Sequence, residues 1–311
     1  MSRVGLLLVL VALLTGCAAG APPLIPVTPL GALRLEGDAR AANPCSLLDP
    51  GLFAREVEPV PVRGDGIGSC RLRGRAPDGH LQALDAAFDS TAATTYAPVE
   101  PPEPAGTATV LRPAPVDDVC RRVVALADGT LAVFSGRGDA GGSWVADCDV
   151  AEQGARAGLR RLATGGITYS PGWNASGGLA GVDACAALGD PSGLLGLIDP
   201  PRYPGFAGWR CLVGLPEPGG TAAWIDFVVV DPQSPAPGGG RTTIGTTPAV
   251  VQPYAGQFSP GCQAYLDRGP VGPPDPAQRQ TVRLTMESPG PADVTCDRLR
   301  TLAADVVTRL G

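Results

Sequence analysis

The sequence predicts an α+β fold of two tandem similar units, each a small antiparallel sheet with a C-terminal helix and two disulfides within the unit. Eight of the nine cysteines fall into two sets of four, and the second set follows the first at a nearly constant offset of about 140 residues. In both sets, apolar runs bounded by Gly and Pro predict strands, and a segment with apolar residues at helical spacing comes last. The sets are Cys45, Cys70, Cys120 and Cys148, then Cys185, Cys211, Cys262 and Cys296.

The N-terminal residues predict export and lipidation. Arg3 is followed by an apolar run from Val4 to Leu14, which is too short to span a bilayer and is typical of a secretory signal. The run ends in Leu14-Thr15-Gly16-Cys17, which resembles the bacterial lipobox. The resemblance implies that Cys17 becomes diacylated and anchors the chain to the outer face of the cell membrane, since two acyl chains anchor stably. The alternative is a secreted protein with a chance cysteine at its cleavage site.

The composition limits the partners. All 24 basic residues are arginine, and the net charge is −6. An acidic chain without basic clusters argues against nucleic acid as a partner and against electrostatic recruitment to a membrane. The membrane contact is therefore expected through the acyl anchor. The absence of lysine indicates a high-GC genome, which together with the lipobox points to an actinobacterium.

Changes in composition divide the chain into five parts. They are a signal peptide (1–16), a lipidated tether rich in Ala, Pro and Gly (17–42), a first four-cysteine unit (43–163), a linker (164–182) and a second four-cysteine unit (183–311). Each unit contains a Pro/Thr-rich stretch, at about 91–116 and 231–260. These stretches are predicted to be loops of a length that is typical of function or disorder.

One strand in each unit carries a repeated acid. Leu81–Asp89 and Ala222–Val230 are predicted strands, the second being the richer in β-branched and aromatic residues. At a common offset, Asp85 in the first strand matches Asp226 in the second. Paired carboxylates occur in glycoside hydrolases. The alternative is that both acids lie on the solvent face of a strand or cap a loop.

A predicted hairpin in the first unit narrows the 105 possible pairings of eight cysteines. Asp128-Gly129 separates two apolar runs and predicts a type I′ turn, which places Cys120 opposite residue 137 or 138. A Gly-rich loop then brings Cys148 back to Cys120, and the first two cysteines of each unit tie a short helical turn to the first strand. The predicted disulfides are Cys45–Cys70, Cys120–Cys148, Cys185–Cys211 and Cys262–Cys296.

Each unit closes with an amphipathic helix. Both helices are predicted to begin at a Cys-Asp pair, Cys148-Asp149 and Cys296-Asp297, because an acid suits the positive end of the helix dipole. Gly165 is the predicted stop of the first helix. The apolar stripes are Ala151, Ala155, Leu159 and Leu162 in the first helix, and Leu299, Leu302, Val306 and Leu310 in the second.

Neither a metal site nor a catalytic site is predicted. Structural zinc sites use close cysteine pairs, often with histidine, and this chain has no such pair and one histidine, His80. His80 follows Pro-Asp-Gly and is expected in an exposed turn. With eight cysteines in disulfides and Cys17 acylated, no thiol is left for nucleophilic catalysis. The sequence thus predicts a protein that is not an enzyme and uses no cofactor.

The cysteine framework resembles a known family. Asn43-Pro44-Cys45, Ser69-Cys70, Val119-Cys120 and Asp147-Cys148 in order resemble a mycobacterial-type family of actinobacterial cell-envelope lipoproteins of unknown function, here in tandem duplication. The second unit matches at Asp183-Ala184-Cys185, Trp209-Arg210-Cys211, Gly261-Cys262 and Thr295-Cys296. The framework is also similar to the extracellular sensor domains of some mycobacterial kinases. The resemblance brings no catalytic residues.

These observations together favour a non-catalytic, lipid-anchored binding or sensor module of the bacterial cell envelope. Its partner is expected to be an envelope protein, a small molecule or a lipid, bound by the long loops or in the crevice between the units. A scaffold lipoprotein of an envelope complex is the first alternative. An envelope hydrolase is the second.

Overall fold

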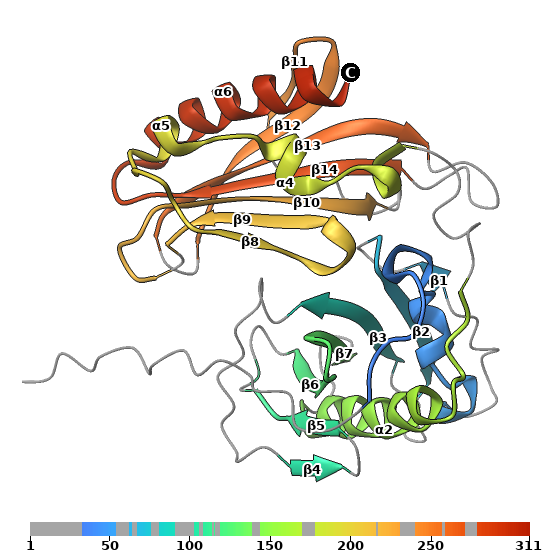
Figure 1. Ribbon diagram of the computed structural model, residues 1–311. Helices are drawn as coiled ribbons and strands as arrows, with labels where there is room; N and C mark the ends of the chain where they lie inside the picture. Colours follow the sequence, from blue (N-terminus) through green and yellow to red (C-terminus); the bar gives the residue numbers. More distant parts are fainter. Residues whose placement is uncertain are drawn as a thin grey trace, which may run out of the picture.

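Two seven-stranded antiparallel sheets, each packed against a long helix, make up the protein (Figure 1). The computed structural model describes residues 33–53, 62–63, 67–75, 81–90, 103–105, 108–113, 115, 119–138, 144–169, 178–215, 217–230, 240–256, 259–270 and 279–311. The predicted signal peptide, the lipidation site Cys17 and His80 lie outside these residues. The predicted α+β class, with antiparallel sheets and a C-terminal helix, is confirmed.

The two sheets have the same strand order. The first runs β1 (Val62–Arg63), β2 (Ser69–Arg75), β3 (Leu81–Ser90), β7 (Thr130–Gly138), β6 (Cys120–Ala125), β5 (Ala108–Leu111) and β4 (Glu103–Ala105). The second, read from its other edge, runs β8 (Arg202–Pro204), β9 (Arg210–Gly214), β10 (Ala222–Val230), β14 (Arg279–Glu287), β13 (Gly261–Pro270), β12 (Thr247–Tyr254) and β11 (Gly240–Ile244).

Two long helices and several short ones complete the fold. Helix α2 (Trp144–Ala163) packs on β7, β6 and β3, and α6 (Ala292–Leu310) packs on β13, β12 and β14. The short helices are η1 (Ala39–Ala41), η2 (Pro44–Leu47), η3 (Pro50–Leu52), η4 (Gly178–Gly181), α4 (Ala184–Leu188), α5 (Ser192–Leu195) and η5 (Phe206–Gly208).

All four predicted disulfides are present. Cys45 in η2 is bonded to Cys70 in β2, and Cys185 in α4 is bonded to Cys211 in β9. The other two bonds, Cys120–Cys148 and Cys262–Cys296, join β6 to α2 and β13 to α6. In every pair the Cα atoms are 5.0 Å apart, within the normal range for a disulfide.

The predicted hairpin turn has a different geometry from the type I′ turn. The Leu126 nitrogen donates to the Thr130 oxygen at 2.9 Å, so three residues form the loop. Only Gly129 among them has a positive φ, of 81°, whereas a type I′ turn needs two such residues. The extra loop residue moves the register, and Cys120 therefore lies opposite Gly136 rather than residue 137 or 138.

Two further predictions are corrected by the structure. The helices begin at Trp144 and Ala292, so the Cys-Asp pairs lie one turn inside them, and the acids of the first turns are Asp147 and Asp293. The stretches 91–116 and 231–260 are not loops throughout, because they contain β4, β5, β11 and β12. In β12, alternate residues such as Ala249 and Val251 are buried, a strand pattern that the neighbouring prolines obscure in the sequence.

Aromatic side chains join the two sheets. Phe88 at the end of β3 stacks on Phe206 at a ring-centroid distance of 5.2 Å, and Phe206 meets Trp209 edge-on at 6.0 Å. The Trp209 indole nitrogen donates to the Ala180 oxygen at 3.0 Å. Packed aromatic rings therefore lie between the two sheets, in the region where a ligand-binding crevice was expected.

The segment before the first cysteine contacts both units. Arg40 donates through Nε to the Ala207 oxygen and through Nη1 to the Gly181 oxygen, both at 3.0 Å. Ala42 is fully buried and forms a β-bridge with Tyr169. Residues 33–42, predicted as the end of a tether, thus pack onto the folded protein.

Candidate functional site

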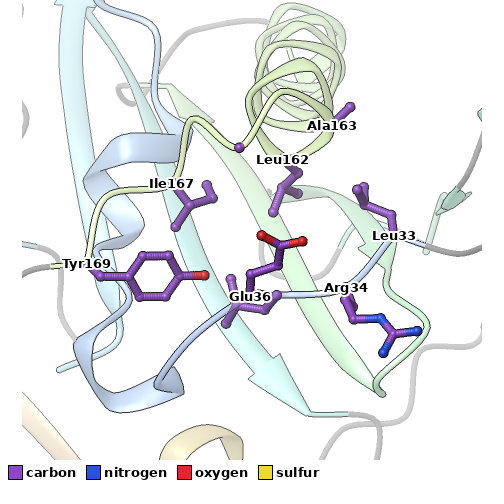
Figure 2. A pocket seen from close by; sticks show the side chains of 9 residues that line it. Leu33, Arg34, Glu36, Leu162, Ala163, Ile167 and Tyr169 are labelled. Carbon is purple, nitrogen blue, oxygen red and sulfur yellow. The ribbon is translucent and has the colours of Figure 1, made fainter.

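A pocket of about 290 Å³ lies at the C-terminal end of α2 (Figure 2). Three segments surround it: residues 33–36, the last turn of α2, and residues 165–169. The lining residues are Leu33, Arg34, Leu35, Glu36, Leu162, Ala163, Gly165, Ile167 and Tyr169. Its volume is at the lower limit for small-molecule sites in proteins.

The end of α2 shapes one side of the pocket. Gly165 has a φ of 67°, a conformation that favours glycine, and it is the second residue after the helix. The Gly166 nitrogen donates to the Arg161 oxygen at 2.7 Å, and the Gly165 nitrogen donates to the Leu162 oxygen at 3.4 Å. This pair of bonds is the Schellman arrangement, which ends a helix and reverses the chain. The predicted stop at Gly165 is therefore confirmed, and the reversal brings Ile167 beside the N-terminal segment.

The N-terminal segment forms the opposite wall. The Ala127 nitrogen donates to the Leu33 oxygen at 2.7 Å, and the Leu35 nitrogen donates to Asp128 Oδ2 at 3.0 Å. The other oxygen of Asp128 accepts from the Thr130 nitrogen at 2.9 Å. One carboxylate thus orders the hairpin turn and holds the pocket wall against it.

Tyr169 closes one end of the pocket. Its ring lies against Gly37, where a Cβ atom would come within 3.0 Å of the ring. Figure 2 shows the Tyr169 hydroxyl directed toward the Glu36 carboxylate. Burial raises the pKa of Tyr169, and the negative charges of Glu36 and Asp128 raise it further. The phenol therefore stays protonated at neutral pH and can donate a hydrogen bond.

The pocket combines an apolar wall with a few polar groups. Its apolar wall comes from Leu33, Leu162 and Ile167, and its polar groups are a guanidinium, a carboxylate and a phenol from Arg34, Glu36 and Tyr169. Such a lining fits an amphipathic small molecule.

The two repeated acids do not form a shared site. Asp85 accepts from Arg71 at 2.6 and 3.0 Å in the first sheet. Asp226 pairs with Arg210 and Arg283, each at 3.1 Å, in the second sheet. Each acid is therefore already paired with arginine in its own sheet. A glycosidase pair that flanks one bond is not formed.

The sequence offset that matched these two acids differs by two residues from the offset between equivalent positions of the two sheets. Cys70 lies opposite Ala86, and Cys211 lies opposite Ile225. Counted from these cysteines, Asp85 corresponds to Trp224, and Asp226 corresponds to Ala87. A displacement of two keeps both acids on the sheet face opposite the long helix, because side chains alternate along a strand.

The described residues give no evidence of a metal site or a membrane-spanning helix. No three His, Cys, Asp or Glu side chains in the described ranges are grouped so that they could hold a metal ion. Within the same ranges, no helix has the length and apolar character needed to cross a membrane.

The pocket residues were not identified from the sequence, although two signals point to them. Leu33-Arg34-Leu35-Glu36 alternates apolar and charged residues, which is typical of an ordered extended segment rather than a tether. Gly165-Gly166 is a helix-stop signal that also predicts a chain reversal. No protein-family model, curated protein or solved structure matches this chain.

Proposed function

We propose that this protein is a lipid-anchored binding module of the cell envelope that holds a small amphipathic ligand in the α2 pocket. The observation that carries the proposal is the pocket itself, with an apolar wall and three polar groups in its lining. An aliphatic or aromatic part of the ligand would contact Leu33, Leu162 and Ile167. Its polar groups would face Glu36, the Tyr169 hydroxyl and Arg34.

The two sheets are proposed to be copies of one duplicated unit. In support, the strand orders are the same, and each unit has one disulfide from a short helix to its second strand and one from its sixth strand to its long helix. Each disulfide closes a loop of 25 to 34 residues and stabilises by about 3–4 kcal/mol in the chain-entropy model. Such a framework would hold the pocket preformed.

The anchor would keep the pocket near the membrane. Cys17 precedes Leu33 by 16 residues, which reach at most about 55 Å when fully extended. The pocket wall begins at Leu33, so a ligand would be held within that distance of the bilayer. Intact-mass measurement of the mature chain and of Cys17→Ala tests the anchor, since only the former should carry acyl chains.

A blocking substitution tests the pocket. Ala163 lines it but is exposed on the surface of α2, so Ala163→Trp should fill the pocket without disturbing the core. Ala304→Trp makes the same change at an exposed position of α6 and serves as the control. Native mass spectrometry of protein purified from its own envelope should show a small-molecule adduct on the wild type and the control, and none on Ala163→Trp. An adduct retained equally by all three proteins, or none on the wild type, contradicts the proposal.

A further inference from the structure

We propose a second ligand site, for a phosphate group, on the face of the first sheet opposite α2. Its centre is Ala83 in β3, which lies opposite Arg73 of β2 on one side and opposite Arg137 of β7 on the other. Paired residues point to the same face of an antiparallel sheet. Since neighbouring strands lie about 4.8 Å apart, the Cα atoms of the two arginines are about 10 Å apart. The small Ala83 side chain leaves the space between the two guanidinium groups open.

A cavity of about 310 Å³ occupies this position. Its described lining holds three arginines and no acid: Arg71, Arg73, Leu81, Gln82, Ala83, Arg137 and Gly138. Leu81 is 47% exposed and gives the site an apolar edge. A phosphate ester, with a charged group for the arginines and a carbon chain for Leu81, matches both features.

The two central arginines are available for a ligand. Arg71 is engaged by Asp85, which accepts from its Nε and Nη2 atoms. Arg73 and Arg137 are exposed and form no ion pair with any residue in the described part of the chain. Guanidinium groups bind phosphate through two parallel hydrogen bonds, so two of them can hold one phosphate group from both sides.

The sheet assembles a basic surface that is not visible as a run in the sequence. Arginines at alternate positions of β2 and single arginines of β6 and β7 come to the same face, in a chain whose net charge is −6. They are Arg71, Arg73, Arg75, Arg121 and Arg137. The expectation that the chain lacks basic clusters is therefore wrong for this face. The surface is separate from the α2 pocket, and the inference does not depend on the proposed function.

Binding of defined phosphates tests the site. The full-length chain with its four disulfides formed is titrated calorimetrically with inorganic phosphate and with glycerol 3-phosphate. It is also mixed with vesicles of phosphatidylglycerol and phosphatidylcholine, and with vesicles of phosphatidylcholine alone. The test variant is R73Q/R137Q. The control, R241Q/R298Q, removes two positive charges from exposed positions of the second unit.

The wild type and R241Q/R298Q are expected to bind phosphate alike, and R73Q/R137Q about 100-fold more weakly, or about tenfold per arginine. Binding of glycerol 3-phosphate that is weakened in R73Q/R137Q, but not in the control, assigns the site to a soluble phosphate ester. Arginine-dependent binding to phosphatidylglycerol vesicles alone assigns it to a lipid headgroup. Equal binding by the two double variants, or no binding of any probe by the wild type, overturns the proposal.

Discussion

The long helices of the two units place residues of opposite size at matching positions. Counted from the cysteine that ties each helix to its sheet, α2 has Gly154 and Gly158 where α6 has Leu302 and Val306. A Cβ atom on Gly158 would lie 2.2 Å from the Phe134 ring, so α2 packs closely on its sheet only because this side chain is absent. In the second unit, Leu302 and Val306 are themselves buried.

The sheets show the reverse pattern. Counted from the paired cysteines, the first sheet has Leu84 and Phe134 where the second has Ala223 and Leu284. Large residues thus lie on the strands in one unit and on the helix in the other. Because interiors are close-packed, volume lost in one layer must be supplied by the facing layer. The two sheets share a strand order, and they differ in how the space between sheet and helix is filled.

The opposite faces of the sheets differ in charge and in burial. Where the first sheet has Arg73, Ala83 and Arg137 in one row, the second has Gly214, Ala222 and Glu287. Arg73 and Arg137 are exposed, whereas Glu287 is buried. The difference indicates that the first sheet offers a charged face to a ligand, while the second uses its polar residues internally.

Enlarging one buried residue of α2 should have the largest effect on stability. Gly158→Val gives α2 the residue type of α6 and forces contact with Phe134, so unfolding free energy should fall by about 3 kcal/mol. Adding Phe134→Leu, the residue type of the second sheet, should recover about half of that loss. Urea denaturation of both variants measures it. Equal stability of Gly158→Val and the wild type would show that the close packing of α2 on Phe134 does not require glycine at position 158.

Removing either of the two strand acids, Asp85 or Asp226, should lower stability by an intermediate amount that differs between the sheets. Asp226 is buried and serves two arginines, so Asp226→Asn should cost about 2 kcal/mol by leaving Arg210 and Arg283 without their acid. Asp85 pairs with one arginine and its side chain is somewhat more exposed than that of Asp226, so Asp85→Asn should cost about 1 kcal/mol. Thermal and urea unfolding compare the two. A larger loss for Asp85→Asn would show that the number of arginines paired with each acid does not decide the cost.

The features predicted correctly from the sequence are local or set by covalent chemistry. The disulfides, β10 and the stop at Gly165 depend on chain reversal, strand patterning and glycine geometry. The pocket and the arginine face join segments that are distant in sequence, such as Leu33 with Ile167, or Arg73 with Arg137. Their assembly depends on strand order and register. A single extra loop residue moved the register at Cys120, and a fixed sequence offset misplaced Asp226 by two.

Replacing Glu152 in α2 should have the smallest effect on stability, and this effect should depend on pH. Its carboxylate accepts from Arg122 Nε at 2.8 Å and from Arg112 Nε at 3.3 Å, which ties the helix to its sheet. The matching position of α6 is Arg300, which pairs with Asp297 on its own helix. Glu152→Gln should therefore cost about 1 kcal/mol at neutral pH, and Arg300→Gln less.

The pH dependence follows from the direction of the pKa shift. Burial alone would raise the pKa of Glu152, but hydrogen bonds from Arg122 and Arg112 outweigh it, and the pKa is lowered. A lowered pKa stabilises the folded state above the ordinary carboxyl pKa, and the contribution is lost as pH falls through the folded value. The stability difference between the wild type and Glu152→Gln should therefore shrink from pH 5 toward about pH 3. Urea denaturation across this range measures it, with Arg300→Gln as the control. A difference that stays constant with pH would mean that the carboxylate charge does not tie α2 to its sheet.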